Sequence, residues 1–339
     1  MTRDQKFLLA AAAGAAAVFA GSRALRNRHA IEFRDRVVVI SGGSRGLGLI
    51  MARRLAAEGA RLVLLARDPE ELERARAQLP AEAEVLTMRC DIRRRSDVRA
   101  AMAKVLEKWA AIDVLINNAG VIQVGPLEHM THEDFENAMA THFWGPLHLM
   151  FEAVPSMRHR SFGRIVNISS IGGRMAVPHL APYSASKFAL VGLSDAVRTE
   201  LSQYGIRVTT VSPGLMRTGS PVNADIKGQH EAEYAWFAIA DSTPGLSVSA
   251  DNAARQIIEA CRFGDPELTI SLPAKIAVMA NNAVPRLIAH TMSFVNGILP
   301  GPAGRSGDRH RRGRDAESKW TESGATALTD RAAVANNEV

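Results

Sequence analysis

The sequence alternates between short apolar runs and longer amphipathic stretches over most of its length. Seven apolar runs lie at residues 37–41, 61–66, 85–90, 114–117, 164–169, 207–212 and 267–271. The stretches between them have helical spacing, at about 46–58, 69–78, 96–110, 131–158, 182–204 and 249–263. Strands separated by helices form a parallel sheet that is covered by helices on both faces. The pattern therefore predicts an α/β fold with a single doubly wound, Rossmann-like parallel sheet of about seven strands.

The composition agrees with one folded domain of this kind. The chain has 339 residues, of which 47% are hydrophobic, 22% charged and 5% aromatic. These values exclude a disordered chain, a collagen-like repeat and a small disulfide scaffold. Two cysteines, Cys90 and Cys261, provide neither a disulfide framework nor the spacing of a zinc site, and they favour a reducing compartment.

The net charge of +6 belongs mainly to the N-terminal end of the chain. Residues 1–36 hold seven Lys and Arg against three Asp and Glu, and residues 305–339 hold seven against six. The body between these ends is therefore almost neutral. Because a nucleic-acid groove needs basic residues gathered on the folded body, the sequence predicts no nucleic-acid partner.

Residues 1–34 form a leader in which the stretch 7–22 has no charged residue. This stretch is shorter than the roughly 20 apolar residues of a spanning helix, although the flanking Lys6 and Arg23 can extend its reach. It is interpreted as a membrane anchor, a cleaved signal peptide, or a soluble or surface-lying helix. Arg23, Arg26 and Arg28 after the stretch outnumber Arg3 and Lys6 before it, which predicts that the body lies on the cytoplasmic side of a membrane.

The C-terminal part changes character twice. Residues 273–300 are predicted to be a helical extension with one apolar face, formed by Ile288, Met292, Val295 and Leu299. This face is expected to pack on the body or on a partner subunit, or to dock on a membrane surface. Residues 301–339 are polar and poor in large apolar side chains, so they are predicted to be a disordered tail.

Glycines follow the first predicted strand and lead into a helix. Ligands of doubly wound sheets bind beyond the carboxyl ends of the strands, where glycines let backbone amides approach a pyrophosphate at a helix N-terminus. The alternative is a tight turn made for packing, and the spacing Gly42-x3-Gly46-x-Gly48 differs from the common GxGxxG pattern. We predict a dinucleotide site that includes Gly42, Ser44, Arg45, Gly46, Leu47 and Gly48.

The end of the second predicted strand indicates which dinucleotide. An NAD site usually has a carboxylate there, whereas this sequence has Ala66 followed by Arg67. Guanidinium groups pair with a ribose 2′-phosphate, and Arg45 in the glycine loop is a second candidate. The sequence therefore favours NADP(H), unless both arginines are merely solvated at the surface.

Polar residues also follow the third and fourth predicted strands. Asp91 is placed to accept a hydrogen bond from the adenine amino group. Asn118, Ala119 and Gly120 belong to an Asn-Asn-Ala-Gly segment whose amides tie neighbouring loops together and whose glycine allows close approach to the cofactor. Taken alone, either feature is equally consistent with a simple turn.

Ser170, Tyr183 and Lys187 form the candidate catalytic set. Tyr183 and Lys187 lie four residues apart in a predicted helix and so share one face. A phenol has an ordinary pKa of about 10, and a nearby ammonium favours its ionised form. Ser170, on the loop after the preceding strand, can hydrogen-bond a substrate oxygen. A Tyr-x3-Lys pair alone is commonly surface decoration, but the dinucleotide site upstream favours a catalytic role.

In order and spacing, these motifs resemble the short-chain dehydrogenases/reductases across about residues 35–272. The matching segments are 41–48 for TGxxxGxG, Asp91, 117–120 for NNAG, Ser170, 183–187 for YxASK, and Pro213-Gly214 with Thr218. The resemblance implies hydride transfer between a nicotinamide and a carbonyl or alcohol. It implies that Tyr183 donates the proton in reduction, and that Lys187 binds the nicotinamide ribose and lowers the pKa of Tyr183. It also places Ile92, Pro213, Gly214 and Thr218 in the cofactor site.

Two positions depart from the family pattern. Ser41 stands where threonine is usual, which keeps the hydroxyl. His142 stands where the family has an asparagine that completes the catalytic set and holds a water of the proton relay. A histidine can also donate and accept hydrogen bonds, so we expect a working relay with altered pH dependence. The alternative is a buried structural histidine.

The sequence thus predicts an NADP(H)-dependent oxidoreductase acting on an apolar ketone, aldehyde or alcohol. The substrate loop is expected at 219–248, which contains Tyr234, Trp236, Phe237 and Ile239. The alternatives are a non-catalytic NADP(H)-binding scaffold or redox sensor, and an interaction protein that recruits partners to a membrane. The resemblance further implies a homo-oligomer, a dimer or tetramer, paired through helices around 131–158 and 182–204.

Overall fold

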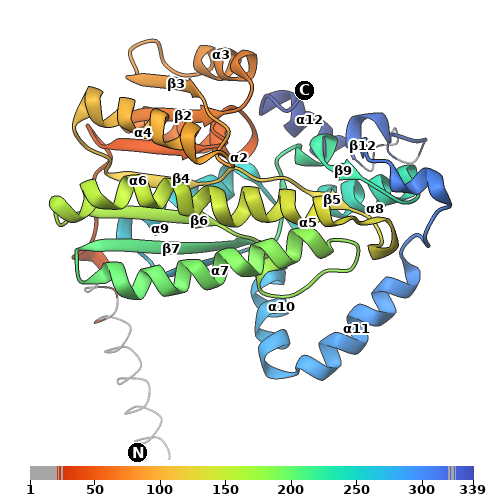
Figure 1. The fold of residues 1–339 in the computed structure, drawn as a ribbon. Helices are drawn as coiled ribbons and strands as arrows, with labels where there is room; N and C mark the ends of the chain where they lie inside the picture. The colour runs from red at the N-terminus through yellow and green to blue at the C-terminus, as the bar shows by residue number, and fades with distance from the viewer. Residues whose placement is uncertain (1–20, 22, 24–25, 320, 322–323, 325) are drawn as a thin grey trace, which may run out of the picture.

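The computed structural model describes residues 21, 23, 26–319, 321, 324 and 326–339. At the centre of this part of the chain is a seven-stranded sheet with the order β11-β7-β6-β4-β1-β2-β3 (Figure 1). All of its strand pairs are parallel. The strands are β1 (Val37–Ser41), β2 (Arg61–Ala66), β3 (Val85–Arg89), β4 (Val114–Asn117), β6 (Gly163–Ile168), β7 (Ile206–Pro213) and β11 (Glu267–Ile270). The predicted doubly wound sheet is confirmed, and each strand ends within one residue of the expected position.

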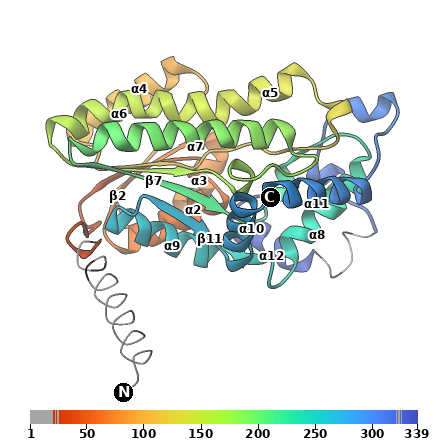
Figure 2. The ribbon, with the colours of Figure 1, turned by 90° about the horizontal axis from the view of Figure 1, so that it is seen from below.

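Helices cover both faces of the sheet (Figure 2). One layer contains α4 (Arg95–Trp109), α5 (His132–Met139), α6 (Gly145–His159) and α7 (Ala181–Ser202), and the other contains α2 (Gly46–Ala57), α3 (Pro69–Ala77) and α9 (Ala250–Phe263). Side chains of β1 alternate between two cores: Val38 and Ile40 pack with α2 and α9, whereas Val37 and Val39 pack with α4 and α6. Burial on both faces explains why the strands are continuous apolar runs.

The expected substrate loop is a small lobe with its own core. It contains η4 (Ser220–Asn223), β9 (Asp225–Ile226), α8 (His230–Ser242) and β10 (Ser247–Ser249). The strand β9 pairs with β5 (Gln123–Val124) and β12 (Arg311–Arg312), and β10 pairs with β8 (Leu215–Arg217). Tyr234 and Phe237 of α8 are buried with Leu180 and Val124 in this lobe.

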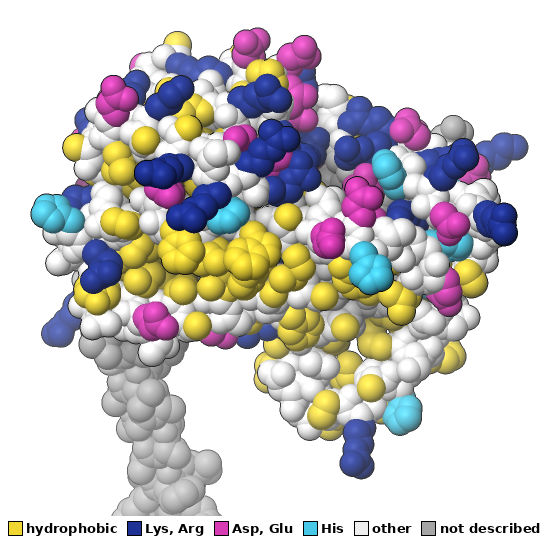
Figure 3. Space-filling view, viewed as in Figure 1, with side chains coloured by type: hydrophobic (Ala, Val, Ile, Leu, Met, Phe, Trp, Pro, Cys, Tyr) yellow, Lys and Arg dark blue, Asp and Glu magenta, His cyan; other side chains and the backbone are white. Residues whose placement is uncertain are grey.

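The predicted helical extension is a hairpin of two helices, α10 (Leu272–Ala283) and α11 (Pro285–Ile298). The predicted apolar face of α11, which includes Ile288 and Met292, is half-buried, and no residue of α11 is fully buried. The hairpin extends away from the sheet in Figure 1, and Figure 3 shows hydrophobic side chains on its outer surface.

The C-terminal tail differs from the prediction of disorder. It contains η5 (Arg305–Asp308), β12, η6 (Gly313–Asp315) and α12 (Ala327–Ala335), and it buries Thr329, Ala333 and Glu338 against the body. Asn336 Nδ2 donates to the Thr218 carbonyl at 3.1 Å, and Asn337 Nδ2 donates to the Ser44 carbonyl at 2.8 Å. The prediction rested on apolar burial alone, whereas polar side chains attach this tail to exposed backbone groups.

Part of the predicted leader also packs on the body. Phe33 is buried, and the Arg26 guanidinium pairs with Asp265 at 2.7 Å and lies over the ring of Phe263. The folded body therefore begins before residue 35. Apart from Gly21, the apolar stretch 7–22 lies outside the described residues, and within the described part no helix is long and apolar enough to cross a membrane.

Candidate active site

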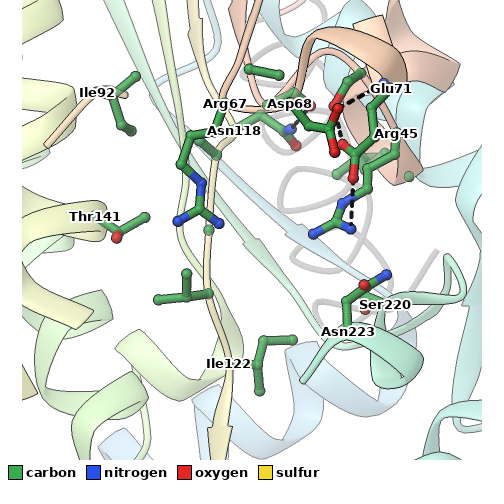
Figure 4. Close-up of a pocket in the computed structure, with 18 of the residues that line it drawn as sticks. Arg45, Arg67, Asp68, Glu71, Ile92, Asn118, Ile122, Thr141, Ser220 and Asn223 are labelled. Atoms are coloured by element: carbon green, nitrogen blue, oxygen red, sulfur yellow. Dashed lines mark hydrogen bonds and ion pairs between the residues drawn. The ribbon is translucent and has the colours of Figure 1, made fainter. Parts of the chain in front are cut away.

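A cleft of about 1210 Å³ opens at the carboxyl ends of the strands (Figure 4). Most of the predicted site residues line it: Gly42, Ser44, Arg45, Gly46, Leu47, Arg67, Asp91, Ile92, Asn118, Ala119, Gly120, His142, Tyr183, Lys187 and Thr218. Gly48, Ser170, Pro213 and Gly214 are not among its lining residues. The fold thus gathers side chains from strands that lie far apart in the sequence into one concave surface.

The glycine loop between β1 and α2 is packed too closely for side chains. Gly42 has φ of +66°, and an added Cβ there would lie 2.8 Å from Ala119 Cα. At Gly48 an added Cβ would overlap the Gly42 carbonyl, so this glycine lets the helix pack closely against the loop. Asn118 Nδ2 donates to the Ser41 and Gly42 carbonyls at 3.2 and 3.0 Å. The first turn of α2 is therefore fixed against the end of β4, and its amides face the cleft.

Two arginines occupy the end of the cleft near the glycine loop, and their surroundings differ. Arg45 lies 3.3 Å from a carboxylate oxygen of Glu71 and 3.3 Å from one of Glu338. Arg67 points into the cleft and, among the described residues, has no hydrogen bond or ion pair (Figure 4). Burial and the nearby Arg93 lower the pKa of Arg67, a group that still stays charged. Arg67 therefore has spare capacity for an anion.

The acidic residues at the same end are already engaged. Asp68 lines the cleft, but its carboxylate accepts hydrogen bonds from the Glu70 and Glu71 amides at 2.8 and 3.2 Å and so caps α3. Asp91 accepts from the Arg93 guanidinium at 2.9 and 2.6 Å. Burial by itself raises the pKa of Asp91, but the hydrogen bonds from Arg93 outweigh it and hold this pKa below its ordinary value. The expected hydrogen bond to adenine would compete with Arg93.

Tyr183 and Lys187 meet at the inner end of the cleft, on one face of α7. Lys187 Nζ donates to the Ile168 carbonyl at 2.9 Å and lies 5.6 Å from the centre of the Tyr183 ring. Ser170 follows Ile168 at the end of β6, where its Oγ accepts from the Gly172 amide at 3.0 Å and its side chain hydrogen-bonds Tyr183. The three predicted catalytic residues are therefore neighbours.

The pKa values at this end do not follow the expectation drawn from the resemblance. Burial lowers the pKa of Lys187 to about 7. Burial also raises the pKa of Tyr183, an effect that Ser170 opposes only in part. The predicted lowering by Lys187 is absent because its amine donates to a main-chain carbonyl and because desolvation disfavours both charged forms. Tyr183 is thus a neutral phenol at physiological pH.

His142 is fully buried in η2 (Ala140–Trp144), a π-helical segment between α5 and α6. Its Nε2 accepts from the Val121 amide at 3.1 Å, so the ring proton is on Nδ1, which lies 2.7 Å from Ser186 Oγ. Burial, with a smaller effect of Lys187, lowers the pKa of His142 well below its ordinary value. Both nitrogens have protein partners, and the ring packs edge-on against Tyr183 at 5.5 Å. This geometry supports the structural alternative over a relay histidine.

Comparison with known proteins places the chain in a family. The family model described as short chain dehydrogenase matches residues 36–228, more than half of the chain. The chain is a short-chain dehydrogenase. Its match to dehydrogenase/reductase SDR family member 7B of Bos taurus is 31% identical over 268 residues, covering 77% of this chain and 81% of that protein.

Solved short-chain dehydrogenases share the fold. L-Sorbose reductase from Gluconobacter frateurii, complexed with NADPH and L-sorbose, has a TM-score of 0.64 and 25% identity, covering 71% of this chain and 97% of that one. A variant of actinorhodin polyketide ketoreductase with NADPH has a TM-score of 0.62 and 31% identity, covering 70% and 96%. The chain is therefore similar to two reductases whose structures hold NADPH.

The C-terminal tail of this short-chain dehydrogenase contributes to the cleft, which its sequence did not predict. Arg312, Arg314 and Glu338 all line it, and both arginines bind Asn223 of the small lobe. Burial raises the pKa of Glu338 to about 7, while Arg45 opposes that shift. No apolar periodicity marks these residues, so only the folded tail reveals them.

Proposed function

We propose that this short-chain dehydrogenase is an NADP(H)-dependent oxidoreductase that interconverts an apolar ketone or aldehyde and its alcohol. The observation that carries the proposal is the meeting of Ser170, Tyr183 and Lys187 at one end of a cleft whose other end holds Arg67. A carbonyl reduction needs a proton donor at the first end, and a phosphorylated dinucleotide needs a cation at the second.

The residues present fit NADP(H). The glycine-lined turn lets a pyrophosphate approach the backbone closely. The guanidinium of Arg67, which has no hydrogen bond or ion pair among the described residues, suits a 2′-phosphate. When bound, this cofactor supplies or accepts the hydride. The NADPH in the two solved reductases described above agrees with this choice.

The chain's own residues supply the proton chemistry. Tyr183, neutral because burial raises its pKa, donates its hydroxyl proton to the substrate oxygen. Ser170 hydrogen-bonds the same oxygen and fixes its position. Lys187 has donors beyond the one used on Ile168, and these hold the ribose hydroxyls. Near neutral pH the phenol of Tyr183 is protonated, which is the form that carbonyl reduction requires.

The surroundings of Tyr183 support an apolar substrate. Tyr183, like Ile122, Val177 and Trp236, packs against the core of the small lobe. Such a lining favours hydrocarbon next to the reacting carbonyl. The two similar reductases described above, a polyketide ketoreductase and an L-sorbose reductase, agree with a carbonyl substrate but differ in its polarity.

The test is NADPH oxidation with a panel of ketones and aldehydes, using wild-type protein and Tyr183→Phe. We expect turnover with NADPH, and a fall in kcat of about 10³-fold in the variant, since the proton donor is lost. The matched control is Tyr204→Phe, which alters a tyrosine that lies against Arg158 away from the cleft. Tight NADPH binding without any turnover that depends on Tyr183 would instead favour the scaffold or redox-sensor alternative.

We also propose that two copies pair through the α6 and α7 face. Trp144, Phe151 and Phe188 are 49%, 60% and 44% exposed there. Figure 3 shows a band of hydrophobic side chains across the middle of the molecule. A contiguous apolar band of this kind is typical of an interface. Light scattering should give a dimer or tetramer for the wild type and a smaller species for Phe151→Glu. A monomeric wild type would contradict this pairing.

A further inference from the structure

The α10–α11 hairpin carries a concentration of exposed apolar side chains away from both the cleft and the α6–α7 face. Its exposed residues, between 45% and 72% accessible, are Leu272, Ile276, Met279, Val284, Leu287, Phe294 and Ile298. The only buried residue of the two helices is Ala274. Scattered exposed apolar residues are ordinary, but a cluster of seven on one projection marks a contact surface.

These side chains form one stripe on each helix. In α10 the exposed residues are spaced by four and three, and in α11 Leu287, Phe294 and Ile298 are spaced by seven and four. The stripe on α11 is distinct from its half-buried face, which contains Ile288 and Met292. The helix is therefore apolar on two sides, one turned inward and one left to an external partner.

Charge indicates which partner. From residue 271 to residue 304 the chain has two cations, Lys275 and Arg286, and no Asp or Glu. Both cations are exposed on the hairpin. An apolar surface with basic residues and no acids complements an anionic bilayer, whose hydrocarbon boundary accepts the apolar side chains and whose headgroups attract the cations.

We propose that the α10–α11 hairpin docks on an anionic lipid bilayer, with Leu287, Phe294 and Ile298 entering the interface. Stable attachment of a protein to a membrane generally needs two contacts. The sequence supplies a second candidate in the uncharged stretch 7–22. The hairpin directly follows the carboxyl end of β11, and the cleft lies at the carboxyl ends of the strands. Docking would therefore present the small lobe to substrates dissolved in the membrane.

The full chain tests this proposal through a dye at Phe294→Cys. Both native cysteines, Cys90 and Cys261, are buried, so an environment-sensitive thiol dye labels the new site selectively. Addition of phosphatidylglycerol vesicles should shift its emission to the blue and raise its intensity several-fold. The matched control is Glu107→Cys, an exposed position on α4 in the opposite helical layer, where no shift is expected.

Flotation provides a second readout. Replacing Leu287, Phe294 and Ile298 together by serine should reduce binding to these vesicles about tenfold or more, since the bilayer then no longer buries three apolar side chains. An unshifted dye at position 294 would overturn the proposal. So would a shift that needs no vesicles and grows with protein concentration, because that result assigns the hairpin to a second copy.

A separate observation concerns the last residues of the tail, which lie on the glycine loop. The Asn336 carbonyl accepts from the Gly46 amide at 2.8 Å, and Glu338 pairs with Arg45. An added Cβ on Gly46 would overlap the Glu338 carboxylate, so the two are in direct contact. A carbonyl thus occupies an amide of the glycine turn that the proposed function gives to the pyrophosphate, and a carboxylate pairs with Arg45, a predicted cofactor residue.

We infer that residues 336–339 form an autoinhibitory plug that NADP(H) must displace, an inference that rests on the proposed function. The Gly46 amide has a single N–H and cannot serve the tail and a cofactor phosphate at once, and Glu338 competes with a phosphate for Arg45. Because Asn337 also donates to the Ser44 carbonyl, release of the tail breaks several contacts together. The tail should therefore weaken cofactor binding without touching the catalytic end.

Calorimetric titration of NADPH into the full chain tests this inference. Glu338→Gln should lower the Kd about fivefold, the range of one partly buried ion pair. Glu317→Gln, an exposed position in the same tail, should leave Kd unchanged. NADPH should also speed hydrogen exchange at the amides of 336–339. Equal Kd values and unaltered exchange would overturn the plug alone, whereas no NADPH binding by any of the three proteins would overturn the proposed function as well.

Discussion

The two ends of the cleft are built on different physical principles. At the glycine-loop end, Arg45 and Arg67 are partly accessible and their surroundings are charged: Glu71, Glu338, Asp91 and Arg93 all lie nearby. At the inner end, Lys187 and His142 are almost completely buried, and burial lowers both of their pKa values, which favours their neutral forms. The first end suits recognition of anions, and the second suits the movement of a single proton.

This difference shows how one cleft separates binding from chemistry. Charge pairs at an accessible end are easily exchanged, so a phosphate can replace a carboxylate at moderate cost in free energy. Groups at a desolvated end respond strongly to small changes, because an ionised form there lacks water. Substitutions at the two ends should therefore change different measured quantities, namely cofactor affinity at one and turnover at the other.

The largest expected effect in this comparison belongs to Arg67. Arg67→Glu should raise the Kd of NADPH about 100-fold, because an attractive charge on the phosphate becomes a repulsive one. The Kd of NADH should change far less. Fluorescence titration with both cofactors measures this, with Arg99→Glu on the exposed side of α4 as the matched charge reversal. Equal losses for NADPH and NADH would remove Arg67 from the 2′-phosphate site.

A smaller effect is expected from His142→Ala. The Val121 amide and Ser186 lose their shared partner, and the Tyr183 ring loses its neighbour, so kcat should fall about tenfold and the free energy of unfolding by about 2 kcal/mol. A shift of the pH profile would accompany a true relay role.

His142→Asn distinguishes the two roles. If the histidine only positions Tyr183, the profile of kcat against pH keeps its shape in both variants and only its height changes. A new acid limb near pH 6 to 7 that disappears with the histidine would contradict a neutral, structural His142.

The smallest effect concerns stability and pH at Lys187. Its folded pKa of about 7 lies below the ordinary value of 10.5, so between these values the unfolded chain binds more protons than the folded one. Stability from this group therefore rises with pH in that window, by about 1 kcal/mol from pH 7.5 to 8.5. Urea unfolding should show this rise in the wild type and a smaller rise in Lys187→Met. Identical slopes would mean that the lysine is charged in the folded protein.

The strands were predictable because parallel strands buried on both faces must be continuously apolar. The break at His142 was not, since 131–158 reads as one helix while the structure inserts the π-helical segment η2 between α5 and α6. The catalytic positions followed from spacing on α7. Their pKa values did not, because desolvation depends on burial depth, which the spacing of Tyr183 and Lys187 does not contain.

The tail shows the opposite limit of sequence reasoning. Its sequence has few large apolar side chains, so composition predicts disorder. Asn336 and Asn337 nevertheless satisfy backbone groups of Thr218 and Ser44, more than a hundred residues away in the chain. Contacts of this kind have no periodicity, and the Glu338–Arg45 pair in the cleft could not have been expected from either segment alone.

The ionisation of Tyr183 decides whether a neutral phenol is available as the proton donor. With tyrosines labelled by carbon-13 at Cζ, an NMR titration of the full chain without cofactor follows each phenol, and Tyr183→Phe assigns the signal. We expect the Tyr183 signal to titrate above pH 10, because burial outweighs the amine of Lys187. A pKa clearly below the ordinary value of about 10 would contradict this, since the lysine charge would then dominate the inner end of the cleft.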